Sequence, residues 1–219
     1  KDDVASGKDV FSFNVSYQGH GPYNTGALDW GDPVWSGNVS EYSYNVINNY
    51  LGSVKNTIEN LCMLKDELEA MDEPVVLVVY GDHKPWLGDD SVTYSELGIN
   101  LDRSTTEGFR NYYTTRYLIW ANDAAKEICG SSFVGEGPDI SPCYLMNELF
   151  SQLGWEGTAY MKFMNDMESS LPVINTSGFY HADGEVTDSL SGSLLGSKQT
   201  IDSVQYYMRR NFLYSEAAS

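Results

Sequence analysis

The 219-residue sequence is short of positive charge and of long apolar stretches. Thirteen Lys and Arg residues face thirty-one Asp and Glu residues, which gives a net charge of −18. Such a surface repels phosphate polyanions, so general binding of DNA or RNA is excluded, and phosphate chemistry would need a cation brought into a local site. The longest apolar run covers residues 75–80. It is far too short for a transmembrane segment, so we expect none in this chain.

Cysteine is scarce as well. Cys62, Cys129 and Cys143 are too few for a disulfide scaffold and have no zinc-ligand spacing. In an extracellular domain we expect Cys129 to pair with Cys143 across a Gly-rich loop and Cys62 to stay reduced in the core, with a reduced pair as the alternative. Cys143 follows Ser-Pro at the start of an expected helix, where a thiol could be acidified, but a buried or bridged cysteine is the plainer interpretation.

The remaining composition is that of a globular chain, with 42% apolar and 13% aromatic residues. Period-two and β-branched patterns predict strands at 10–17, 75–80 and 114–120, and a hairpin at 173–186 that turns at 182–184. A helix of about thirty residues is expected between a Ser40 cap and Pro74. Shorter helices are expected after 121–123, at 143–153 behind a Ser141 cap, at 158–170 and at 197–214. The segments 24–37 and 89–110 are expected to be mainly loops.

The run 75–80 is the type of strand that is covered on both faces of a parallel sheet. We therefore predict an α/β fold with a mainly parallel sheet and helices on both faces, in one domain. Residues 81–86 follow this strand directly. Open parallel sheets bind ligands outside the carboxyl ends of their strands, so this turn is the first place to look for chemistry.

Asp82 and His83 are adjacent on that turn, and a carboxylate next to an imidazole can ligate a divalent cation. The alternative is an Asp that accepts loop amides and a His that packs on Trp86. His20 lies between two glycines after the expected strand at 10–17, where its imidazole could contact a substrate; a solvated loop histidine is the alternative. No complete nucleophile motif and no phosphate-binding glycine loop is present.

The sequence resembles the C-terminal half of the lipoteichoic acid synthase family. Three stretches carry the resemblance: Gln-Gly-His-Gly-Pro around His20, a long helix, and an apolar strand that ends in Gly-Asp-His-Lys-Pro. The segments 118–122, 141–147 and 153–155 are also similar. The resemblance implies that residues 1–219 are the C-terminal portion of a single sulfatase-like, extracellular catalytic domain of the alkaline-phosphatase superfamily, incomplete at the N-terminus.

The same resemblance implies roles for individual residues. Asp82 and His83 would ligate a divalent metal, most often Mn²⁺, and His20 would contact the phosphate or glycerol of the substrate. The threonine nucleophile and a further metal carboxylate would lie upstream, so no catalytic nucleophile is expected in this segment, and alone it should be inactive. Its partners would be the upstream half of the domain, a phosphatidylglycerol-like lipid and a glycerol-phosphate polymer. The implied location is the outer face of a bacterial membrane, anchored by N-terminal helices.

Two other functions are compatible with the same residues. A hydrolase of the same superfamily, either a sulfatase or a phosphodiesterase, would use water as the acceptor. A non-catalytic glycan-binding domain would use Trp30, Trp35 and Trp86. Retention of Asp82 and His83 argues against a pure binding module, because binding alone has no use for a ligand pair.

Overall fold

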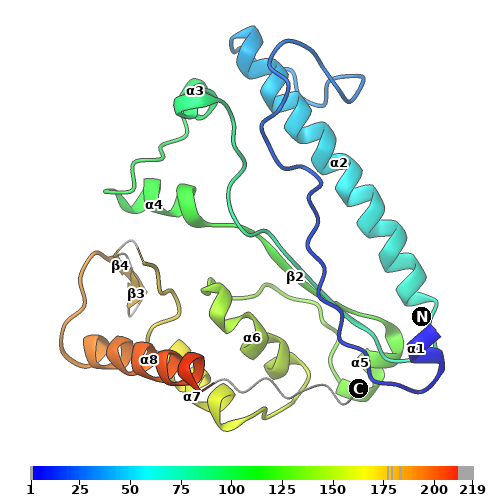
Figure 1. Cartoon of the computed structure of the whole chain (residues 1–219), viewed down its shortest axis with the longest axis vertical. Helices are drawn as coiled ribbons and strands as arrows, with labels where there is room; N and C mark the ends of the chain where they lie inside the picture. The colour runs from blue at the N-terminus through cyan, green and yellow to red at the C-terminus, as the bar shows by residue number, and fades with distance from the viewer. Residues whose placement is uncertain (1, 177, 179, 183, 212–219) are drawn as a thin grey trace. The chain divides into compact units, whose positions relative to one another are not determined.

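The computed structural model describes residues 2–176, 178, 180–182 and 184–211. The chain forms two compact units that divide after Gly130. Both units mix helices with short strands (Figure 1). The first contains α1 (Asp2–Ala5), α2 (Glu41–Glu69), β1 (Val76–Tyr80), the 3₁₀ turn η1 (Asp89–Ser91), α3 (Val92–Glu96), α4 (Thr106–Tyr113), β2 (Tyr117–Ala121) and α5 (Asp123–Cys129). The second contains η2 (Pro142–Tyr144), α6 (Leu145–Gln152), α7 (Ala159–Glu168), β3 (Tyr180–Ala182), β4 (Glu185–Thr187) and α8 (Gly192–Arg210).

The long helix α2 confirms the predicted helix of about thirty residues. Its 29 residues begin after Ser40, whose side chain accepts a hydrogen bond from the Ser43 amide. Such a cap satisfies one of the amides that the first helical turn leaves without a partner. The buried residues lie between positions 43 and 53, so only the N-terminal half of the helix is held in the core of the first unit.

The parallel sheet is not observed among the described residues. Strand β1 pairs with β2 in antiparallel register, from Val76 opposite Ala121 to Tyr80 opposite Tyr117, and β3 pairs with β4 in the same sense. The residues of β1 from Val76 to Val79 are half-buried rather than covered on both faces. An apolar run identifies a strand, but the direction of its neighbour depends on contacts distant in the sequence, which the run itself does not encode.

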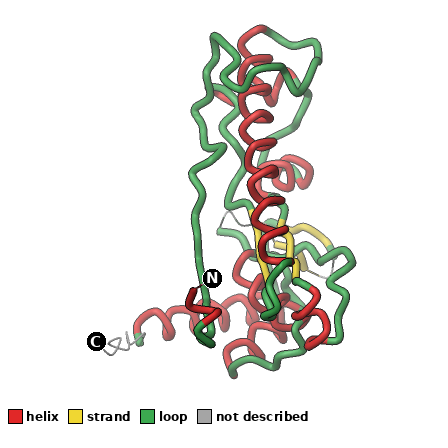
Figure 2. Tube along the Cα trace, turned by 90° about the vertical axis from the view of Figure 1, so that its right-hand side faces the viewer, coloured by secondary structure: helices red, strands yellow, loops and turns green. Residues whose placement is uncertain are grey.

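The prediction of a strand at 10–17 is wrong, because the structure has no strand at these residues. These residues follow α1 as loop, visible in Figure 2 as the segment that leaves the N-terminal helix. Phe11 and Val15 are 83% and 80% exposed. An alternating pattern forms a strand only where a neighbouring strand pairs with it, and none of the described strands pairs with residues 10–17.

The loop at 24–37 is held to α2 by three buried asparagine side chains. Asn45 donates to the Thr25 carbonyl, and Asn48 both accepts from the Trp35 amide and donates to the Trp35 carbonyl. Asn49 accepts from the Asp29 amide and donates to the carbonyls of Asn24 and Ala27. Because their amides replace water around the loop backbone, these polar residues can be buried without a large cost.

The second unit is built around Leu171, Ala182 and Ile201, contributed by the segment after α7, by β3 and by α8. The predicted hairpin and helices are present, although position 183 and residues 212–214 lie outside the described residues. Ser141 stands at the predicted N-cap position, directly before Pro142, but its side chain makes no capping hydrogen bond. Its hydroxyl instead donates to the Ile174 carbonyl at 2.9 Å and accepts from the Ile174 amide at 2.7 Å. A local capping pattern was thus overridden by a contact with a distant segment.

The membrane prediction can be checked against the described helices. None of them combines the length and the apolar character that crossing a bilayer requires. This agrees with the expectation of no transmembrane segment among these residues.

Candidate functional site

A cavity of about 270 Å³ in the first unit is lined by all three sequence-predicted site residues, His20, Asp82 and His83. The rings of His20 and His83 meet edge to face, with 5.8 Å between their centroids. These residues come from two loops that are 62 positions apart in the sequence. The fold therefore brings together the residues that the resemblance assigns to one site; their chemical roles remain predictions.

The His20 loop is fixed to α2 and to its own aromatic neighbours. Gln18 donates to the Asn56 side chain of α2 at 2.8 Å, and the Tyr23 hydroxyl donates to the Gly19 carbonyl. Gly19 has a φ of +83°, and an added side-chain carbon would lie 3.3 Å from the Ser53 hydroxyl. Glycine is needed here both for its backbone conformation and for the close approach to α2. The result is an exposed imidazole on a braced loop.

Both imidazoles are oriented by backbone carbonyls. The Nδ1 atom of His20 lies 2.6 Å from the Gly21 oxygen, and that of His83 lies 2.8 Å from the Lys84 oxygen. A carbonyl only accepts, so each Nδ1 carries the proton and donates. In the neutral ring this leaves the lone pair on Nε2, which is the arrangement found in metal-ligating and base histidines.

Asp82 offers the second donor. Its Oδ1 accepts from the His83 amide at 2.9 Å, while its Oδ2 lies 3.6 Å from His83 Nε2. One carboxylate oxygen and one imidazole nitrogen thus lie close together on an exposed turn, a donor set that suits Zn²⁺ or Mn²⁺. Among the described residues, no three His, Cys, Asp or Glu side chains form a metal-ligating group. The pair fits part of a metal site and would need further ligands.

The rest of the cavity wall is aromatic. Tyr23, Tyr50 and Trp86 line it, and the same residues pack against the core around Val46, Leu87 and Tyr94. Burial, with smaller contributions from Tyr50 and Tyr94, raises the pKa of Tyr23 to about 12, so its phenol is neutral at physiological pH. A neutral aromatic wall beside polar groups suits the carbon skeleton of glycerol or a sugar. Of the three tryptophans proposed for glycan binding, Trp86 is the one that lines this cavity.

Sequence reasoning missed two cations beside the same turn. The pKa of Lys84 is lowered, first by burial and second by the positive charge of Arg116. The Gly81 amide donates to the Arg116 carbonyl at 3.1 Å, which extends the β1–β2 ladder by one step. No short motif signals that Arg116 lies opposite Gly81, because this follows from the antiparallel register of two strands.

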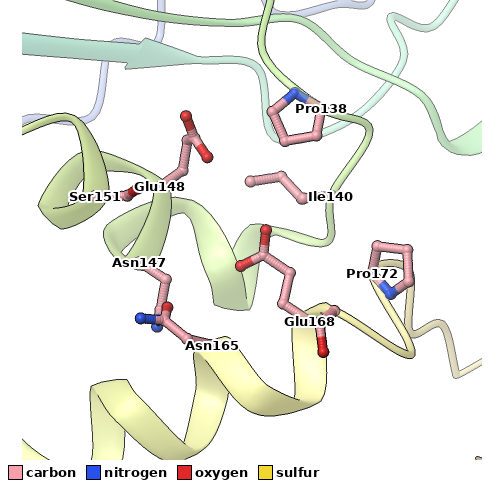
Figure 3. A pocket seen from close by; sticks show the side chains of 9 residues that line it. Pro138, Ile140, Asn147, Glu148, Ser151, Asn165, Glu168 and Pro172 are labelled. Carbon is pink, nitrogen blue, oxygen red and sulfur yellow. The ribbon is translucent and has the colours of Figure 1, made fainter.

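A second cavity, of about 460 Å³, lies in the second unit and contains no residue predicted from the sequence (Figure 3). Pro138, Ile140 and Pro172 form apolar parts of its lining, and the carboxylates of Glu148 and Glu168 face it. Burial and then the charge of Glu148 raise the pKa of Glu168. Its lining thus contains carboxylates but no imidazole, whereas the first cavity has both.

The cysteine predictions are corrected by the structure. All three cysteines are free thiols, so the bridge between Cys129 and Cys143 is not formed, and Cys62 is exposed on α2 rather than in the core. Although solvent reaches part of Cys143, burial of its thiol raises the pKa to about 11. This is the opposite of what a reactive thiolate requires.

Comparison with known proteins gives one distant relative. No family model matches the chain, and no solved structure matches it. The "Putative cyclic beta-1,2-glucan modification protein" of Rhizobium meliloti (strain 1021) is 27% identical over 171 residues, which cover 75% of this chain and 25% of the relative. The chain therefore spans about a quarter of the length of that relative. The likeness is compatible with an enzyme that modifies another molecule, and membership in the lipoteichoic acid synthase family stays a prediction.

Proposed function

We propose that this chain is part of a metal-dependent phosphoglycerol transferase of the cell envelope. The enzyme would move glycerol phosphate from a phosphatidylglycerol-like lipid to a hydroxyl group of an acceptor. The observation that carries this proposal is the meeting of His20, Asp82 and His83 in one cavity, with both imidazoles oriented by backbone carbonyls. The sequence resemblance supplies the reaction class.

The acceptor is the open part of this proposal, and two hydroxyl sources have support. The name of the Rhizobium relative refers to modification of a cyclic β-1,2-glucan. The sequence resemblance instead implies a growing glycerol-phosphate polymer. Both acceptors present hydroxyl groups, and the aromatic wall of Tyr23, Tyr50 and Trp86 suits the carbon skeleton of either.

Asp82 and His83 would hold the cation through Oδ2 and Nε2. A divalent ion bound there would screen the charge of the phosphate and lower the pKa of a bound hydroxyl. The His83 amide, by donating to Asp82 Oδ1, keeps the other carboxylate oxygen available. The carbonyl of Lys84 keeps His83 in the tautomer with Nε2 free.

His20 would act on a substrate hydroxyl. Because Nδ1 donates to the Gly21 carbonyl, Nε2 of the neutral ring can only accept a hydrogen bond. It can therefore accept the proton of an acceptor or glycerol hydroxyl, and in the protonated form return it to a departing oxygen. The braced loop between Gln18 and Tyr23 positions the ring for this step.

The test is an assay of the full-length protein in vesicles. Phosphatidylglycerol labelled in its headgroup glycerol is supplied with Mn²⁺ and with either a β-1,2-glucan or a glycerol-phosphate primer. We expect label on one of the two acceptors and release of diacylglycerol, both lost on chelation. Label released only as free glycerol phosphate would replace transfer with hydrolysis. Binding of glucan with no metal-dependent turnover would favour a binding module.

A further inference from the structure

The cavity of the second unit is rich in hydrogen-bond acceptors and has no positive charge in its lining. Its carboxylates come from Glu148 of α6 and Glu168 of α7, and its lining residues include no Lys, Arg or His. At about 460 Å³ it falls within the range of roughly 300–1,000 Å³ that is typical of small-molecule sites. It has room for an organic ligand, and the proposed transferase chemistry does not use it.

The walls of this cavity are joined to one another by hydrogen bonds. Asn147 of α6 is 2% exposed, and its Nδ2 donates to the Met161 carbonyl at 2.7 Å and to the Asn165 side chain, both in α7. On another side, the Ser141 amide donates to the Pro172 carbonyl at 2.9 Å. These bonds fix α6, α7 and the segment around Pro172 to each other, so the lining is preformed.

Three side chains of the lining have oxygen atoms that no described residue bonds to. Asn147 makes both of its bonds through Nδ2, and its Oδ1 accepts none. No unpaired side-chain oxygen of a described, unexposed residue is fully enclosed, so this Oδ1 is open to the cavity. Glu148 accepts from the Gln152 side chain at Oε1 only, and both carboxylate oxygens of Glu168 lack a donor among the described residues. A ligand that donates several hydrogen bonds would satisfy these acceptors.

The charge of the lining limits what this ligand can be. Glu148 and Glu168 repel any anion, so a phosphate group does not fit. A bare metal ion fits poorly as well. Hard cations such as Ca²⁺ take about six to eight oxygen ligands, and no three His, Cys, Asp or Glu side chains among the described residues form a metal-ligating group. An uncharged molecule with several O–H donors meets neither obstacle.

The apolar part of the lining narrows the ligand further. Pro138, Ile140 and Pro172 provide apolar surface in the same cavity as the carboxylates (Figure 3). A sugar ring combines hydroxyl groups, each of which donates one hydrogen bond, with C–H groups that pack on such surface. A metal ion or a small polar molecule would leave this apolar surface unused.

We propose that the cavity of the second unit binds a neutral hexose unit of a glycan, through hydroxyl groups that donate to Glu148, Glu168 and Asn147. It would be a binding site only, because the reacting groups of the proposed transferase lie in the first cavity. The inference goes beyond the proposed function and does not rest on it, since a transferase, a hydrolase or a glycan-binding protein could each hold a sugar here.

The experiment titrates the full-length protein with two glucose disaccharides, cellobiose and sophorose, by calorimetry. The double variant Glu148→Gln/Glu168→Gln keeps the shape of both side chains and removes their charge. We expect it to fold normally and to bind the sugar about tenfold more weakly, because hydrogen bonds to charged acceptors are the stronger ones. The matched control is Asp166→Asn, an exposed carboxylate of α7 outside the lining, which should change the affinity by less than about twofold.

Two further measurements separate a sugar site from an acidic patch. Ser151→Trp places a large side chain in the lining from an exposed position of α6, so it should abolish sugar binding and leave the circular dichroism spectrum unchanged. Raising NaCl from about 50 to about 300 mM should change the sugar affinity by less than about twofold, because a neutral ligand is not screened. Ethanolamine and CaCl₂, titrated in the same way, test for a cationic ligand.

Three results would overturn the sugar site. One is the absence of saturable binding of both disaccharides. Another is saturable binding of ethanolamine or Ca²⁺ in place of the sugars. The third is an unchanged sugar affinity in the double variant or in Ser151→Trp, which would mean that the sugar binds elsewhere, for example on the aromatic wall of the first cavity. Asp82→Asn should leave the sugar titration unchanged, so failure of the proposed function is seen separately.

Discussion

The two cavities of this protein differ in the kinds of side chain that line them, and the larger cavity is not the one that contains the predicted site residues. The smaller one, of about 270 Å³, contains two imidazoles, a carboxylate and an aromatic wall, with two cations nearby. The larger one, of about 460 Å³, offers carboxylates, amides and hydroxyls together with the apolar Pro138, Ile140 and Pro172, and its lining contains no imidazole. Chemistry on phosphate needs groups of different kinds within reach of each other. The contrast indicates that the variety of side chains, rather than volume, identifies the candidate site.

The largest expected effect is on the metal pair of the first cavity. Asp82→Asn removes the carboxylate charge while keeping the shape of the side chain. We expect turnover of the full-length enzyme to fall by about a thousandfold and bound Mn²⁺, measured by elemental analysis, to be lost. Asp89→Asn, on the exposed 3₁₀ turn that follows, is the matched control and should keep both. Normal metal content and turnover in Asp82→Asn would remove the metal site from this cavity.

His20→Ala separates substrate contact from metal binding in the same cavity. The full-length variant should lose about tenfold to a thousandfold in kcat/KM and keep its metal, because His20 is expected to contact the substrate rather than the ion. The free energy of unfolding should change by less than about 0.5 kcal/mol, since the side chain is exposed. His181→Ala, in the hairpin of the second unit, controls for loss of an imidazole. Near-normal turnover would mean that the His20 loop has only a structural role.

The three asparagines of α2 that hold the loop at 24–37, Asn45, Asn48 and Asn49, are called the Asn clamp below, and their replacement should affect stability rather than chemistry. Asn49 is 1% exposed and makes three hydrogen bonds to the loop at 24–37. Asn49→Ala leaves these backbone groups without partners and should cost about 2–3 kcal/mol in urea unfolding of the chain. Asn60→Ala, on the exposed part of the same helix, should cost less than about 0.5 kcal/mol. Equal losses for both would mean that the loop does not depend on the clamp.

The smallest effect concerns the acidic cavity. The pKa of Glu168 is raised by burial and by Glu148, so the folded protein holds this proton more tightly than the unfolded chain, and the associated stability is lost as pH rises through the folded pKa. Glu168→Gln removes that penalty. We expect a Tm higher by about 1–3 °C at pH 7 and no gain below about pH 4, measured by scanning calorimetry.

Glu156 provides the control of opposite sign for this prediction. A hydrogen bond from Lys162, and then its charge, lower the pKa of Glu156. That contribution is present above the unfolded pKa and is lost as pH falls through the folded value. Glu156→Gln should therefore lower Tm slightly at pH 7 and have no effect in acid. A higher Tm in both variants would show that net charge, rather than the local environment of Glu168, sets the response.

The sequence predicted the parts of the fold that depend on local patterns. Helix α2 follows from regular apolar spacing and the Ser40 cap, and β1 follows from its β-branched run. The direction of β2 and the fate of 10–17 could not be predicted, because they depend on which strand pairs with which. Ser141 is the N-cap residue that was predicted, but the bond of its hydroxyl to Ile174 could not be predicted, because it joins segments that are distant in the sequence.

The candidate site was predictable to a similar extent. His20, Asp82 and His83 stand out because each follows a strand-like pattern on a short turn, and the structure places them in one cavity. Arg116 carries no such signal, since it is the pairing of β1 with β2 that places its backbone opposite Gly81, next to Asp82. The buried asparagines of α2 were equally hidden, because Asn in an amphipathic helix has the sequence appearance of a solvent-facing residue.

The Asn clamp affects which positions of the loop at 24–37 tolerate substitution. The hydrogen bonds that Asn45, Asn48 and Asn49 make to the loop all go to main-chain atoms. These hydrogen bonds therefore depend on the backbone conformation of the loop and not on the identity of its side chains. Outward-facing positions such as Val34, which is 51% exposed, can be exchanged while the backbone keeps its path. Side chains at these positions can thus change without loss of the hydrogen bonds that hold the loop to α2.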